Sequence, residues 1–214
     1  VDMTNLKQVD EVLSQYGQDK NVILWAETPS NPLLKVTDIR AVSALCDKSS
    51  VPFVVDATWM TPWLCQPLSL GADLVVHSTT KYFGGHSDLT GGAIVRSSMC
   101  KDAARSLFDK AKFNQSVVGA VPSPFDCWLT LRGLRSLSAR VDVHTKNAMA
   151  VARYLESHDR VSHVHYPGLE GHPGHEIMKR QSRVAVERSV AVGISESGGD
   201  DVEDPDWIFD DTPP

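Results

Sequence analysis

The sequence predicts an α/β fold in which a largely parallel sheet is covered by helices on both faces. Short apolar runs bounded by turn residues alternate with longer stretches in which apolar residues recur at helical spacing. Strands of a parallel sheet are buried on both faces, so they read as continuous apolar runs. Such an alternation of strands and helices is typical of an α/β domain. The expected strands are residues 22–25, 52–55, 74–76 and 91–95.

Apolar spacing also locates the helices. Leu6, Val9 and Leu13 recur along one face of the first helical stretch, and Thr37 is a candidate cap for the second. A loop of small residues, 116–124, leads into a long helical region in which Gly133 is a tolerated weak point. The expected helices are residues 4–16, 38–47 and 98–112, followed by the long region from about 129 to 155.

Composition excludes several classes of protein. The net charge is -6 and there is no basic stripe, which argues against a nucleic-acid partner. The longest apolar runs, such as 53–55 and 74–76, are far too short to span a membrane. No basic region followed by an apolar stretch begins the chain, so we expect no signal peptide.

The cysteine pattern indicates a reducing compartment. The 4 cysteines are far apart in the sequence and form no C-x-x-C pair. In a chain of 214 residues this spacing is typical of reduced thiols. Together with the absence of a signal peptide, it predicts a cytoplasmic protein.

Polar residues with a shared chemical purpose follow the expected strands. Asp56 comes directly after the strand 52–55, and Lys81 follows 25 residues later in a segment with Ser78 and Thr80. Asn31 lies in the loop after the first strand. Because the carboxyl ends of parallel strands share one edge of a sheet, one site can collect these side chains. A lysine amine forms a Schiff base with an aldehyde cofactor, a carboxylate pairs with a pyridinium nitrogen, and hydroxyls donate to a phosphate.

Each of these residues also has an ordinary structural explanation when taken singly. A lone lysine is usually a solvated charge, and an aspartate at a strand end is often a cap. Ser78 and Lys81 match the S-x-x-K motif of penicillin-recognising serine enzymes. Those enzymes also need S-D-N and K-T-G elements, whereas this chain has only Ser87-Asp88-Leu89 and no K-T-G.

Histidines raise the separate possibility of a metal site. His163 and His165 alternate along an expected strand, and His172 and His175 bracket a loop. Neither an H-E-x-x-H motif nor a cysteine pair accompanies them, so we expect surface or structural histidines and no metal.

The segment from Asp56 to Gly92, with its core S-T-T-K-Y-F-G-G-H-S-D, resembles the cofactor-lysine region of a known enzyme family. This is the Cys/Met-metabolism family of pyridoxal-phosphate enzymes, which includes cystathionine gamma-synthase, gamma-lyase and beta-lyase. The resemblance spans about residues 1–181. It also includes the motifs at residues 27–32, 121–129, 131–134, 166–169 and 172–173.

The resemblance implies a role for each candidate residue. Lys81 would carry pyridoxal 5'-phosphate as a Schiff base and then move protons on the substrate, and Asp56 would pair with the pyridinium nitrogen. Ser78 and Thr80 would bind the phosphate. Asn31 would lie near the cofactor's phenolic oxygen and the substrate carboxylate, and Arg188, in a segment similar to the family's R-L-S-V-G-I, would bind that carboxylate.

The resemblance further implies the fold, the reaction class and the assembly. The fold would be fold type I, the aspartate-aminotransferase type. The reaction would be transsulfuration: C–S bond cleavage or formation in a small sulfur amino acid, by a lyase or a gamma-replacement transferase. Gamma-replacement, gamma-elimination and beta-elimination all stay open. The family usually forms homotetramers, so we expect a homo-oligomer.

Several features indicate a truncated family member. The chain does not begin with Met, and the family's N-terminal portion, with its glycine-containing phosphate cup and stacking tyrosine, has no counterpart. Ala57 stands where the family usually has Asn. A catalytically inactive scaffold of the same family is therefore the alternative function.

The expected domain organisation follows from the same comparison. Residues 1–140 would form part of the large cofactor-binding domain, and residues 141–181 would begin a smaller C-terminal α+β domain. Residues 182–214 are acidic and rich in turn residues, and we expect them to form an aberrant or partly disordered tail.

Overall fold

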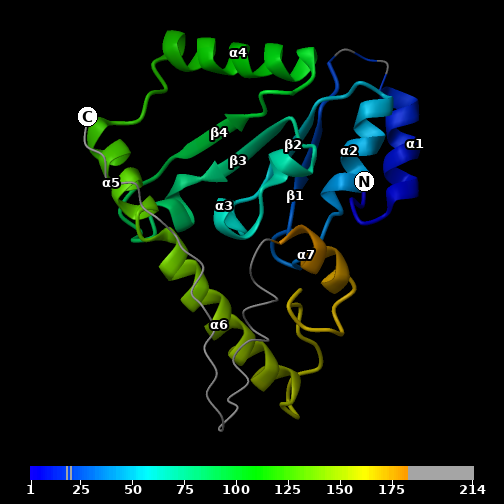
Figure 1. Ribbon diagram of the computed structural model, residues 1–214, viewed down its shortest axis with the longest axis vertical. Coiled ribbons are helices and arrows are strands. Elements are labelled where there is room, and N and C mark those ends of the chain that lie inside the picture. Colours follow the sequence, from blue (N-terminus) through cyan, green and yellow to red (C-terminus); the bar gives the residue numbers. More distant parts are fainter. Residues whose placement is uncertain (18, 20, 183–214) are drawn as a thin grey trace, which may run out of the picture.

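The computed structural model describes residues 1–17, 19 and 21–182 (Figure 1). Its centre is a sheet in the order β1-β2-β3-β4. The strands are β1 (Leu24–Glu27), β2 (Phe53–Asp56), β3 (Leu74–Ser78) and β4 (Gly92–Arg96). The first three are parallel, and β4 runs antiparallel to β3. The predicted, mostly parallel sheet is therefore confirmed, with one antiparallel strand.

β1, β2 and β4 begin one or two residues later than predicted, and β3 begins at the predicted residue, Leu74. The expected first strand, 22–25, is displaced because the first hydrogen bond of its ladder joins Leu24 N to Pro52 O at 2.9 Å. Val22 and Ile23 precede that bond and remain outside the strand. The other predicted strands overlap the observed ones to within two residues at each end, which is the usual uncertainty of such boundaries.

One face of the sheet carries the main core. Helices α1 (Leu6–Tyr16) and α2 (Ile39–Lys48) pack on this face, as Figure 1 shows. Their buried residues join apolar side chains of the first three strands. The members of this core include Val9, Leu13, Ile39, Val42, Cys46, Ala26, Phe53, Val55 and Val75. Fully burying each large apolar side chain stabilises the fold by about 1.5–3 kcal/mol.

The opposite face is covered only in part. Val54 and Leu74 are buried there, but Trp25 of β1 is 51% exposed and Ile94 of β4 is 47% exposed. The prediction that helices cover both faces is thus fulfilled on the α1–α2 face and incomplete on the other. The continuous apolar run of a strand indicates what it can bury, but the neighbouring elements decide what is covered.

Two helix ends differ from the sequence prediction. The cap of α2 is Asp38, whose side chain accepts a hydrogen bond from Ala41 N at 3.1 Å, and the predicted cap Thr37 is wrong. Thr37 is instead buried, and its backbone N–H donates to Thr28 Oγ1. Helix α4 (Asp102–Val118) runs beyond the predicted end at residue 112. It stops at Gly119, whose φ of 75° favours glycine.

The long helical region is two helices, α5 (Pro124–Leu134) and α6 (Leu137–Glu156). Ser123 caps α5 by accepting from Asp126 N at 3.0 Å. The predicted domain boundary near residue 140 falls inside α6, and the division into domains stays a prediction. Short elements complete the described fold: α3 (Thr61–Leu64), the 3₁₀ turn Pro67–Leu70, the π-helical turn Thr79–Phe83 and α7 (His175–Gln181).

The histidine-rich segment after α6 is not a strand. His163 and His165 lie in irregular backbone, with ring centroids 4.3 Å apart, so the expected strand there is wrong. Within the described residues, no three His, Cys, Asp or Glu side chains gather as metal ligands would. In the same part of the chain, no helix combines the length and apolarity needed to cross a bilayer.

An ion cluster around the buried Asp73 joins the amino ends of the strands to α2. Lys101 Nζ lies 2.9 Å from Asp73 Oδ2 and 2.7 Å from Asp47 Oδ1. The Asp73 side chain is only 4% exposed and also accepts from Phe53 N at 2.8 Å. Burial alone would lower the pKa of Lys101, but the two carboxylates outweigh it and raise that pKa.

We expect Lys101→Met to lower the free energy of unfolding by about 3 kcal/mol, because it leaves the buried Asp73 carboxylate without its cation. Urea unfolding measures this change. The matched control is Lys7→Met, since Lys7 is 87% exposed and lies 4.0 Å from Glu11. That control should stay within about 0.5 kcal/mol of the wild type. Equal effects of the two substitutions would contradict the prediction.

Candidate active site

The carboxyl ends of three strands meet at one edge of the sheet. Asp56 is the last residue of β2, and it pairs in register with Glu27 of β1 and Val76 of β3. Ser78 ends β3 two residues beyond that register point. The strand ends thus bring Asp56 and the segment before Lys81 to the same edge, as the sequence predicted.

Asp56 is tied to β3 through Thr58. Asp56 Oδ1 accepts from Thr58 N at 2.9 Å, and Thr58 Oγ1 accepts from Ser78 N at 2.8 Å. Within the described residues, no hydrogen bond is made by Asp56 Oδ2. Asp56 therefore presents one engaged and one available carboxylate oxygen. Sequence reasoning did not single out Thr58, because the bond to Ser78 joins residues 20 positions apart.

Lys81 lies in a tight turn directly after β3. We call residues 79–85 the lysine turn; it contains the π-helical turn Thr79–Phe83 and two following glycines. Lys81 itself departs from helical geometry, with φ −89° and ψ −117°. Gly84 N donates to Thr79 O at 2.9 Å, and Gly85 N donates to Lys81 O at 2.7 Å. The Lys81 residue is exposed to solvent.

The two candidate phosphate-binding hydroxyls differ in their partners. Thr80 Oγ1 accepts from Gly91 N at 2.9 Å and donates to Gly91 O at 3.4 Å. The Ser78 hydroxyl makes no hydrogen bond to any of the described residues. Ser78 can therefore donate to an anion directly, whereas Thr80 must first release its long bond to Gly91.

Two predicted site residues remain, Asn31 and Arg188. Asn31 follows β1, and its backbone N–H donates to Glu27 Oε2 at 3.2 Å. Asn31 follows the carboxyl end of β1, which lies at the same edge of the sheet as Asp56. Arg188 lies outside the described residues.

A buried histidine behind Asp56 was not singled out from the sequence. His77 of β3 is 3% exposed, and its ring stacks on Phe83 with centroids 4.8 Å apart. Burial lowers the pKa of His77, although the Asp56 carboxylate opposes the shift. The lowered pKa favours the neutral form of the imidazole. The available signal was its position in the same motif as Lys81, directly after the last apolar residue of the predicted strand, Val76.

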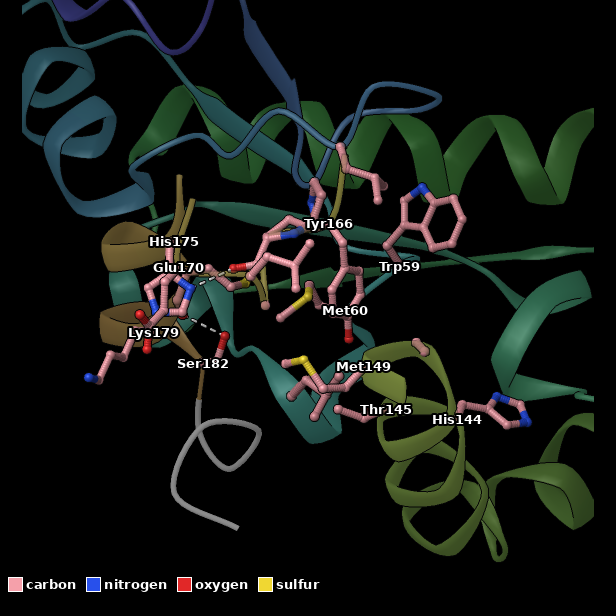
Figure 2. Close-up of a pocket in the computed structure, with 18 of the residues that line it drawn as sticks. Trp59, Met60, His144, Thr145, Met149, Tyr166, Glu170, His175, Lys179 and Ser182 are labelled. Atoms are coloured by element: carbon pink, nitrogen blue, oxygen red, sulfur yellow. Dashed lines mark hydrogen bonds between the residues drawn. The ribbon is translucent and has the colours of Figure 1, made fainter. Parts of the chain in front are cut away.

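A pocket of about 570 Å³ opens beside the lysine turn. Tyr82, the neighbour of Lys81, lines it together with Trp59 and Met60, which follow Asp56 in the chain. Figure 2 shows Met149 of α6 and Tyr166 of the loop after α6 pointing into the same space. Burial raises the pKa of Tyr166. The sequence did not predict this pocket, because its walls come from segments that are far apart in the chain, between Pro29 and Ser182.

The groups at the sheet edge suit a carbonyl cofactor that carries a phosphate. They are an exposed amine on Lys81, a carboxylate with one available oxygen on Asp56, and an available hydroxyl on Ser78. The amine can attach an aldehyde, the carboxylate can bind a protonated ring nitrogen, and the hydroxyl can donate to phosphate. The chemistry of these side chains therefore fits the predicted pyridoxal phosphate.

A family profile described as "Cys/Met metabolism PLP-dependent enzyme" matches residues 1–196. The chain belongs to this family. The cofactor of the Cys/Met-metabolism family is pyridoxal phosphate, as the sequence resemblance implied. The predicted family is therefore confirmed over most of the chain.

Named family members are closely similar in sequence. A cystathionine gamma-lyase from Dictyostelium discoideum is 47% identical over 179 residues, which are 84% of this chain and 44% of the relative. A cystathionine gamma-synthase from Mycobacterium leprae is 52% identical over 161 residues, or 75% of this chain and 40% of the relative. The chain thus spans less than half the length of these relatives.

Solved structures of the Cys/Met-metabolism family have the same fold. The cystathionine gamma synthase of Xanthomonas oryzae pv. oryzae, in complex with aminoacrylate and cysteine, matches with a TM-score of 0.77 and 43% identity. The match covers 86% of this chain and 45% of that structure. The predicted fold type I class is confirmed by this similarity. The roles of the individual site residues stay predictions.

Proposed function

We propose that this chain carries the cofactor-binding residues of a transsulfuration enzyme that cleaves or forms C–S bonds in sulfur amino acids. The proposed reaction is of the cystathionine gamma-lyase or gamma-synthase type. The observation that carries the proposal is the juxtaposition of Asp56 with the lysine turn at the carboxyl edge of the sheet. The family and the names of the similar proteins support it.

Each residue has a defined task in this proposal. Pyridoxal phosphate, when bound, supplies an electron sink for the substrate. Lys81 Nζ would hold the cofactor, and after a substrate amine displaces it, the freed amine would take a proton from the substrate carbon and return it. Asp56 Oδ2 would bind the ring nitrogen and keep it protonated, because a carboxylate stabilises the positive charge. Ser78 and Thr80 donate to phosphate, and Asn31 and Arg188 orient the substrate carboxylate.

Assembly with further copies of the chain is part of the proposal. Helices α4 and α5 and the turn between them leave large apolar side chains exposed, and such surfaces commonly mark protein interfaces. These side chains are Phe113, Val117, Val118, Val121, Phe125, Trp128 and Leu131. They support the proposed homo-oligomer, a tetramer as is usual in the family. A cytoplasmic location is a separate part of the proposal and rests on the cysteine pattern.

The labelling of Lys81 tests the proposed function. The protein is incubated with pyridoxal phosphate, reduced with borohydride and mapped by peptides. We expect the label on Lys81 to exceed that on any other lysine at least about tenfold, because Lys81 follows β3 at the sheet edge where Asp56 and the Ser78 hydroxyl lie. Lys81→Arg should abolish this selective label. Lys110→Arg, at an exposed position of α4, should leave it unchanged.

If the chain is an inactive scaffold, the labelling experiment should have the opposite outcome. A scaffold without a functional site would spread the label over the exposed lysines, with no preference for Lys81. The S-x-x-K serine-enzyme reading has lost its support, because the family match accounts for both Ser78 and Lys81.

A further inference from the structure

The guanidinium of Arg140 reaches from α6 to the backbone of the lysine turn. Arg140 Nη2 donates to Tyr82 O at 2.8 Å and to Gly133 O at 2.8 Å. Arg140 Nε donates to Ser136 Oγ at 3.0 Å. One side chain therefore holds together the lysine turn, the last turn of α5 and the start of α6.

The lysine turn is also pressed closely against its neighbours. A Cβ atom added to Gly133 would collide with Phe83 O and Gly84 O, so α5 backs directly onto the turn. A Cβ atom added to Gly85 would collide with Arg140 Nη1. Gly85 has a φ of 74°, a conformation that glycine adopts without cost. The turn thus lies between the α5 backbone and the Arg140 guanidinium.

The charge of Arg140 is directed to carbonyl oxygens. Among the described residues, no carboxylate forms a salt bridge with Arg140, and its Nη1 is buried without an acceptor. A buried donor without an acceptor costs stability, so a gain in stability is a poor explanation for this arginine. A guanidinium does, however, present several donors in one rigid plane, which a lysine ammonium cannot reproduce.

We propose that Arg140 is a positioning residue that fixes the lysine turn and thereby the direction of the Lys81 side chain. This inference rests on the proposed function of Lys81. The bonded carbonyl belongs to Tyr82, the residue directly after Lys81. Lys81 departs from helical geometry, so regular helical hydrogen bonds alone do not fix the backbone of the lysine turn. The hydrogen bond from Arg140 to Tyr82 O fixes the turn relative to α6.

Amide hydrogen exchange, measured without cofactor, tests the role of Arg140. We expect Arg140→Met to accelerate exchange at the Gly84 and Gly85 amides at least about tenfold. The Val55 amide of β2, in the centre of the sheet, should change less than about twofold. Arg140→Lys keeps the charge but loses the planar donors, so an intermediate acceleration is expected. Arg140→Lys is the milder change, so it can replace Arg140→Met in this test if Arg140→Met does not fold.

The control and a second readout separate positioning from general stabilisation. Arg135→Met, at an exposed residue whose side chain makes no hydrogen bond or ion pair in the described part of the chain, should leave exchange unchanged. In borohydride labelling, the share of label on Lys81 should fall several-fold in Arg140→Met and less in Arg140→Lys. Unchanged exchange in the lysine turn, or equal acceleration in the turn and in β2, would overturn the proposal. A wild type that fails to label Lys81 would instead refute the proposed function, since the exchange result is independent of the cofactor.

Discussion

Asp56→Asn is expected to reduce turnover of the proposed sulfur amino-acid substrate roughly tenfold to a hundredfold. The amide keeps the shape of the carboxylate but loses the charge that holds the ring nitrogen protonated. A hydrogen bond to a charged group contributes about 1.5–3 kcal/mol, and each 1.4 kcal/mol corresponds to about a factor of ten. The rate at which the protein releases a keto acid from the sulfur amino acid measures the change.

The attachment of the cofactor should respond differently from turnover. The share of borohydride label on Lys81 should stay within about twofold of the wild type in Asp56→Asn, because attachment needs the lysine amine. Asp88→Asn is the matched control, since Asp88 is exposed in the same motif, and it should leave both measurements unchanged. Wild-type turnover in Asp56→Asn would show that the role given to Asp56 is wrong.

The rate of alkylation is expected to differ by a factor of about a thousand between the exposed and the buried cysteines. All of the cysteines are free thiols, and Cys127 alone is exposed. Burial raises the pKa of Cys46 from 9.0 to about 12, and burial raises that of Cys65 to the same value. Three pH units correspond to roughly a thousandfold lower thiolate fraction near pH 8, and the thiolate is the reactive form.

Mass spectrometry after iodoacetamide treatment measures these rates. Cys127 should be modified first, and a Cys127→Ser variant should take up almost no reagent while folded. In urea, all of the cysteines should react at comparable rates, which serves as the control for intrinsic reactivity. Reaction of Cys46 or Cys65 within about tenfold of Cys127 in the folded protein would contradict the burial of these thiols.

The sequence was sufficient for the features that depend on neighbouring residues. Continuous apolar runs predicted the strands, and the order of strands and helices predicted a largely parallel sheet. The prediction that Asp56 and the lysine turn meet at one edge followed from the rule that parallel strands end together. Thr37 was a wrong cap because Thr37 and Asp38 are both good capping residues, and only the chain direction at α2 selects Asp38.

By itself, the sequence determined the fold class, the family and the motif that contains Lys81, because each of these is recorded in local spacing and residue type. The tertiary structure decided which sheet face is covered, that His77 lies buried behind Asp56, and that Arg140 bonds to Tyr82. The last contact joins residues 58 positions apart. Contacts over such separations depend on how helices pack against the sheet, and no local periodicity encodes that packing.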